Sequence, residues 1–224
     1  MKGNYYTLAK IRSVIIYAVG LMAAVALTSQ PTFADIIYTN LGPGNSYGFW
    51  VGGWQLNGLD EGGEVVANQF TVGTEATVWD AQLALTRFSD SNDPLDVYIE
   101  SDVLGLPGVI LDTLSQVGVL PTGPMGGLVP FLCTGPGCTL AAGTYWLVAW
   151  NPNPDGLGGW YFTDDDANGP VAANYEDNAA GPWDFSGNTY ANAFQVETPE
   201  PGSLLLLGSG LVLGGMALRR KRRA

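Results

Sequence analysis

Short stretches in which apolar and polar residues alternate, separated by turn-forming residues, run through the middle of this chain of 224 residues. From Leu95 to Glu100 every second residue is aliphatic, which is typical of a strand with one buried face. Clusters of Gly, Pro, Asn and Asp, such as those at 92–94 and 151–156, suit tight turns. No stretch between the two ends of the chain shows a convincing 3.6-residue period.

This pattern predicts an all-β domain over residues 35–197, built as an antiparallel β-sandwich or jelly roll. Strands are expected at residues 36–40, 48–54, 65–72, 77–88, 95–100, 109–114, 128–132, 144–150, 159–163 and 190–197.

Residues 1–34 have the three parts of a secretory signal peptide. Lys2, Lys10 and Arg12 precede an apolar run at 13–29, and small residues then lead to Ala34. Cleavage by signal peptidase is expected after Ala34, and an uncleaved N-terminal anchor is the alternative.

Residues 198–224 contain a short apolar run between a proline motif and a basic end. Pro199, Glu200 and Pro201 precede 16 uncharged residues at 203–218. As a helix this run would be about 24 Å long, less than the ~30 Å of a hydrocarbon core, but thinning and snorkelling can compensate. A permanent anchor and a buried helix are the competing interpretations. The cations that would keep this end cytoplasmic are Arg219, Arg220, Lys221, Arg222 and Arg223.

The order of these three parts resembles the PEP-CTERM sorting signal of Gram-negative bacteria. In that family the tail holds an exported precursor in the inner membrane until an exosortase recognises and removes it. The resemblance implies processing by signal peptidase and exosortase, transient residence in the inner membrane, and a final place in the periplasm, on the outer surface or in the extracellular matrix.

The charge of the segment between the two ends differs from that of the whole chain. All 21 acidic residues lie between Asp35 and Glu200, where Arg87 is the one basic residue, so this segment carries −20 against −12 for the chain. A segment this negative disfavours nucleic acid and anionic lipid as partners. The chain also has no His, and so lacks the usual general base and the Ser-His or Cys-His nucleophile pairs. We expect a non-enzymatic protein.

Two cysteines, Cys133 and Cys138, bracket a Thr-Gly-Pro-Gly sequence. An even number of cysteines in an exported chain, placed across a turn, predicts a disulfide that staples a hairpin. Because the closed loop is small, its stabilisation should lie at the lower end of ~2–4 kcal/mol.

A second resemblance covers residues 69–197. Its strongest parts are the strand at 97–102, the Pro107-Gly108 turn and the segment 142–148 (AGTYWLV). These parts are similar to choice-of-anchor domains, in particular the type R group, which are exported bacterial β-rich modules with differing C-terminal sorting signals. The resemblance implies a surface or matrix protein and brings no catalytic residues.

Asp164, Asp166 and Asn168 alternate before Gly169, as in the opening D-x-D-x-N-G of a calcium loop. An EF-hand is excluded because its twelfth position is Tyr175 and no helices are expected on either side. A looser calcium-binding turn and an ordinary solvated acidic turn both stay open.

Seven tryptophans supply flat rings that could stack on sugars. Trp146 and Trp150 are expected in the core, whereas Trp160 and Trp183 lie among Gly, Asp and Asn and are expected to be exposed. The favoured function is therefore an exported structural or interaction protein associated with exopolysaccharide in the envelope or matrix. The alternative is a carbohydrate-binding module, with or without calcium.

Overall fold

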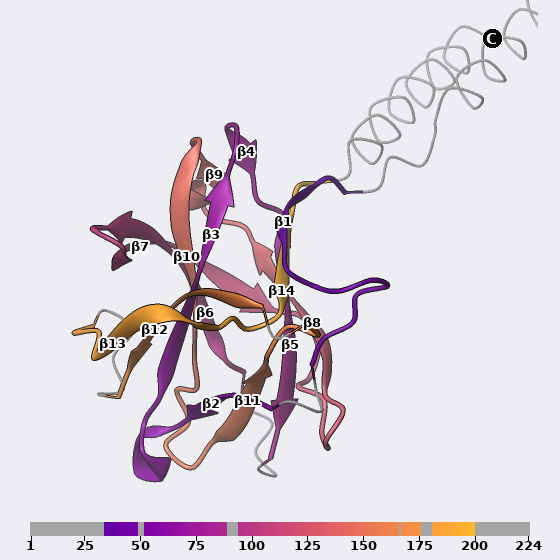
Figure 1. The fold of residues 1–224 in the computed structure, drawn as a ribbon, viewed down its shortest axis with the longest axis vertical. Helices are drawn as coiled ribbons and strands as arrows, with labels where there is room; N and C mark the ends of the chain where they lie inside the picture. The colour runs from indigo at the N-terminus through magenta and orange to yellow at the C-terminus, as the bar shows by residue number, and fades with distance from the viewer. Residues whose placement is uncertain (1–33, 49–51, 89–93, 166, 176–180, 200–224) are drawn as a thin grey trace, which may run out of the picture. The chain divides into compact units, whose positions relative to one another are not determined.

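The computed structural model describes residues 34–48, 52–88, 94–165, 167–175 and 181–199 (Figure 1). Residues Asp35–Pro199 form one compact unit. The expected signal peptide before Ala34 and the apolar run and basic end of the tail lie outside the described residues. Within the described ranges, no helix has the length and apolar character needed to cross a membrane.

The described chain is built from strands, with two short 3-10 turns, η1 (Leu59–Glu61) and η2 (Pro136–Cys138). The all-β prediction is confirmed. The strands are β1 (Ile36–Thr39), β2 (Gly53–Asn57), β3 (Val65–Val72), β4 (Ala76–Thr77), β5 (Asp80–Arg87), β6 (Asp96–Val103), β7 (Leu106–Gln116), β8 (Gly127–Cys133), β9 (Thr139–Leu140), β10 (Gly143–Trp150), β11 (Leu157–Tyr161), β12 (Asn168–Asn174), β13 (Phe185–Tyr190) and β14 (Phe194–Glu197).

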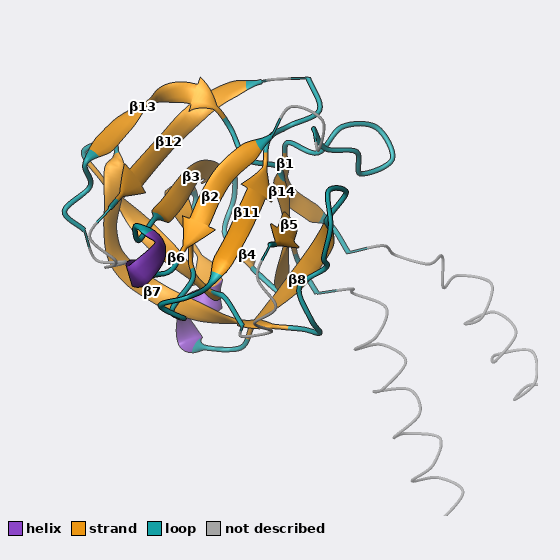
Figure 2. Cartoon of the chain, turned by 90° about the horizontal axis from the view of Figure 1, so that it is seen from below, coloured by secondary structure: helices purple, strands orange, loops and turns teal. Residues whose placement is uncertain are grey.

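Twelve of these strands belong to one sheet with the order β1-β14-β5-β8-β7-β6-β10-β3-β12-β13, and β2 and β11 extend it beside β5. Each pairing between these strands is antiparallel. The arrangement differs from a sandwich of two separate sheets, because the twelve-stranded sheet curls around its own core (Figure 2). Phe70 of β3 and Phe194 of β14 are distant in strand order, yet their ring centroids are 6.3 Å apart.

Several expected strand boundaries differ from the observed ones. β3 begins and ends where the sequence predicts. Of the strand expected at 48–54, residues 49–51 lie outside the described residues, and β2 (Gly53–Asn57) overlaps only its end. β12 was not expected, since it contains Asn168, Gly169 and Pro170, which are poor strand formers. Its pairing with both β3 and β13 overrides that local preference.

Strands β3 and β10 bury side chains on both faces. Leu147 and Ala149 point into the main core, whereas Trp146 and Val148 belong to a second cluster on the other face. The second cluster consists of Val65, Ala67, Trp146, Val148 and Ala172, and the half-buried Tyr98, Leu106, Trp150 and Trp183 pack against it.

Candidate functional sites

Cys133 and Cys138 form the expected disulfide, with their Cα atoms 5.7 Å apart. Cys133 is the last residue of β8, and Cys138 is the last residue of η2. Both residues are buried. The bond therefore fastens the η2 turn to the end of β8, and strand β7 lies beside both.

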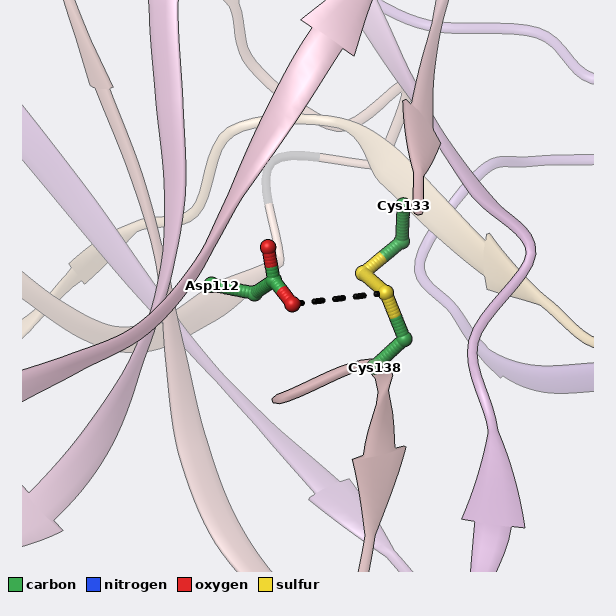
Figure 3. A group of neighbouring side chains, drawn as sticks. All are labelled: Asp112, Cys133 and Cys138. Atoms are coloured by element: carbon green, nitrogen blue, oxygen red, sulfur yellow. Dashed lines mark hydrogen bonds between the residues drawn. A yellow bond between two sulfur atoms is a disulfide. The ribbon is translucent and has the colours of Figure 1, made fainter. Parts of the chain in front are cut away.

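A carboxylate that sequence reasoning missed lies against this disulfide. Figure 3 shows the side chain of Asp112, from β7, pointing toward Cys138, with 3.6 Å between Oδ2 and Sγ. Because a disulfide sulfur carries no proton, this contact is not a hydrogen bond. The Asp112 carboxylate instead accepts hydrogen bonds from the backbone N–H of Gly137 to Oδ2, at 2.9 Å, and from that of Thr113 to Oδ1, at 2.8 Å.

The glycines of the η2 turn are needed for this close approach. A Cβ on Gly135 would lie 2.1 Å from Asp112 Oδ2, and one on Gly137 would lie 2.1 Å from the carbonyl oxygen of Leu111. Gly135 and Gly137 are thus needed for the close packing of this segment against β7 as well as for the turn itself. No pattern in the sequence near Asp112 indicates this contact, because 25 residues separate Asp112 from Gly137.

The expected calcium turn is only partly within the described residues, because Asp166 lies outside them. Asp164 accepts a hydrogen bond from the Ser46 hydroxyl at 2.6 Å, so one of its oxygens binds the loop after β1. Asn168 is exposed, is the first residue of β12, and pairs with Tyr190 in the sheet. Calcium binding at Asp164, Asp166 and Asn168 stays a prediction.

The structure confirms one of the tryptophan predictions and contradicts another. Trp146 is buried as expected, but the prediction that Trp160 is exposed is wrong. Trp160 is fully buried in the main core, where its indole N–H donates to the carbonyl of Ala193 at 3.0 Å and its ring meets Phe194 edge-on. The sequence misled because the glycines next to Trp160 belong to β11, which is flanked by β2 and β5, and not to an open loop.

Trp183 is half-buried against the second cluster, and within the described ranges its indole nitrogen has no hydrogen-bond partner. The most exposed indole in the described part of the chain is instead Trp79, at 49%. The sequence did not single out Trp79. It precedes the first residue of β5, Asp80, and its neighbour Val78 takes the buried position.

Glu100 is a second acidic residue that the sequence did not single out. It lies in the centre of β6 between Trp146 of β10 and Ile110 of β7, and it is fully buried. Neither carboxyl oxygen has a hydrogen-bond partner among the described residues. Burial raises the pKa of Glu100 to about 8, so the side chain is mostly protonated at neutral pH.

The sorting motif begins directly after the last strand. β14 ends at Glu197, and Pro199 is the last residue described, so Glu200, Pro201 and the basic residues 219–223 lie outside the described part. Residues 197–223 match the PEP-CTERM protein-sorting motif. The tail is therefore a PEP-CTERM sorting signal. This motif indicates an exported, exosortase-sorted protein of a Gram-negative bacterium.

The PEP-CTERM match covers the tail and leaves the β-domain without an assigned relative. No curated protein matches the chain, and no solved structure matches it. The similarity of residues 69–197 to choice-of-anchor domains remains a prediction.

Proposed function

We propose that this chain is a non-enzymatic structural or interaction protein of the envelope or extracellular matrix, associated with exopolysaccharide. It would be released from the inner membrane by exosortase after signal peptidase has cut behind Ala34. The observation that carries the proposal is the PEP-CTERM motif at 197–223, which begins where β14 ends. The sorting signal is thus joined directly to a compact exported domain.

The negative charge and the disulfide of the domain support this role. A segment with 21 acidic residues and one basic residue stays dispersed outside the cytoplasm and repels nucleic acid and anionic lipid. The disulfide suits an oxidising compartment. The resemblance to choice-of-anchor domains points to the same destination.

The test replaces Pro199, Glu200 and Pro201 together by Ala in the full-length chain, expressed in a host that contains an exosortase. Wild-type protein should lose its C-terminal segment and leave the inner membrane, whereas the variant should stay there as full-length precursor. Fractionation and intact-mass spectrometry distinguish the two. Mature wild-type protein that still carries residues 204–224 would show a permanent anchor and overturn the proposal.

Carbohydrate binding is a second candidate function, and the exposed ring of Trp79 is the observation that favours it. Exposed indoles stack on sugar faces, and alanine removes that surface. If the domain binds the host's exopolysaccharide, Trp79→Ala should reduce retention on the immobilised polysaccharide severalfold. Leu104→Ala removes a non-aromatic side chain that is 99% exposed and is the matched control.

Trp183→Ala tests the remaining sequence-predicted position in the same assay, and addition of millimolar calcium tests whether the ion assists. No retention of the wild-type protein, with or without calcium, would exclude this second candidate and leave the first one intact.

A further inference from the structure

The cluster of Asp112 with Cys133 and Cys138 has the donor set of a soft-metal site. One carboxylate oxygen and the two sulfurs all lie within 4.8 Å of one another. In the oxidised chain the sulfurs are bonded to each other, and thiolates rather than disulfides bind metal. We infer that reduction of this disulfide opens a zinc site formed by the Cys133 and Cys138 thiolates and the Asp112 carboxylate.

The distances fit zinc with little rearrangement. In a tetrahedral site with Zn–S of about 2.3 Å and Zn–O of about 2.0–2.2 Å, a sulfur and an oxygen are roughly 3.5–3.6 Å apart and two sulfurs roughly 3.7–3.8 Å. Asp112 Oδ2 is already 3.6 Å from Cys138 Sγ (Figure 3). Once the S–S bond is broken, rotation about the Cα–Cβ bonds can separate the sulfurs while the Cα atoms stay 5.7 Å apart.

The surroundings hold the carboxylate in place for this role. The N–H groups of Gly137 and Thr113 fix the orientation of Asp112, and hydrogen bonds of this kind to a ligand strengthen metal sites. Two thiolates select zinc over the hard cations calcium and magnesium. Three protein ligands leave the fourth position for water.

The change from disulfide to zinc site takes two steps, a thiol–disulfide exchange and then metal binding. A dithiol gives two electrons and two protons to the Cys133–Cys138 bond and is itself oxidised to a disulfide. Zinc then displaces the two thiol protons into solvent and binds the two thiolates together with the side-chain oxygen of Asp112. The η2 turn is held to β8 by a covalent bond in the oxidised state, and to both β7 and β8 by a metal ion in the reduced state.

The test uses the full-length chain in detergent, reduced without oxygen by a phosphine and titrated with Co²⁺ as a coloured substitute for zinc. The reduced wild-type protein should bind one equivalent, with the near-ultraviolet absorption of cobalt thiolate, and zinc should displace it. The oxidised protein should bind none. Cys133→Ser should abolish the signal, and Asp112→Asn should weaken binding at least about tenfold.

Asp155→Asn, at an exposed turn residue, is the matched control and should bind like wild type. Near-ultraviolet circular dichroism reports whether the reduced domain keeps its fold. If reduction unfolds it, Asp112 no longer lies beside the sulfurs and Asp112→Asn will bind as tightly as wild type. Equal affinity of these two proteins, for this or any other reason, overturns the inference, as does the absence of a thiolate signal.

Discussion

Asp35 and Thr198, 163 residues apart in the chain, are joined by three hydrogen bonds beside the β1–β14 pair. The Asp35 N–H donates to Thr198 Oγ1 at 3.1 Å, and the Thr198 hydroxyl and N–H both donate to the Asp35 carbonyl, at 3.2 and 2.9 Å. Signal peptidase is expected to cut just before Asp35, and the Pro-Glu-Pro motif begins just after Thr198. The start of the exported domain and the start of the sorting signal therefore lie side by side.

Replacing Thr198 by Ala should loosen this junction without unfolding the domain. The change removes two of the three hydrogen bonds at an exposed position, so the free energy of unfolding should fall by no more than about 1 kcal/mol. For a domain of this size that corresponds to a decrease in Tm of at most roughly 2–4 °C. Hydrogen exchange at the backbone amide of residue 198, which donates to the Asp35 carbonyl, should become faster.

Thr77→Ala is the matched control, since it removes a hydroxyl that contacts Thr139 in the separate β4–β9 pair. It should leave exchange at the amide of residue 198 unchanged. Equal exchange rates in all three proteins would show that the junction is not held by Thr198.

Glu100 should make the domain less stable as the pH rises. Its pKa is raised by burial from 4.5 to about 8, so the folded state binds more protons than the unfolded state between these values. The stabilisation is complete below about pH 4.5 and is lost as the pH rises through 8. Glu100→Gln abolishes this titration. Between pH 5 and 9 the variant should gain on the order of 4 kcal/mol relative to wild type in urea unfolding.

The exposed Glu61→Gln serves as control for the general effect of removing one negative charge from an acidic domain. Parallel stability profiles of Glu100→Gln and wild type across this range would mean that Glu100 keeps an ordinary pKa.

A buried pair of asparagines links β3 to the segment before β14. The Asn68 side chain donates to Asn192 Oδ1 at 2.9 Å and accepts from the Asn192 N–H at 2.9 Å, and the Asn192 amide also donates to the carbonyl of Trp160. Asn192→Ala leaves the Asn68 amide and that carbonyl without these partners in the core. We expect a loss of about 2–4 kcal/mol in the free energy of unfolding, measured with urea.

Asn188→Ala, at an exposed position of β13, should change the stability by less than about 0.5 kcal/mol. Similar losses in the two variants would argue that the buried pair makes no special contribution.

Gly137 should not tolerate even a methyl group. Alanine there would bring Cβ to 2.1 Å from the Leu111 carbonyl oxygen, so β7 and η2 would have to separate. The Tm of Gly137→Ala should fall by several degrees. Gly73→Ala, where nothing lies within 4 Å of the added Cβ, should melt like wild type or slightly higher. Unchanged melting of Gly137→Ala would show that the η2 turn can shift freely.

Local sequence patterns were sufficient to predict the secondary-structure class of the chain and to find its sorting signal. Alternation and turn chemistry depend on neighbouring residues, and so the all-β class, the bounds of β3 and the Cys133–Cys138 pairing could be predicted from the sequence. The PEP-CTERM signal could be found in the same way, because the motif, the apolar run and the basic end are consecutive.

Which side chains meet was decided by the tertiary structure alone. Trp160 follows two glycines and Trp79 follows Val78. Neither neighbourhood shows that β11 is flanked on both sides and buries Trp160, or that Trp79 precedes β5 and stays exposed. Asp112 reaches the disulfide, and Asn68 reaches Asn192, because a curled antiparallel sheet brings together strands that are far apart in the chain. Register and curvature depend on the packing of the whole core, which no local pattern encodes.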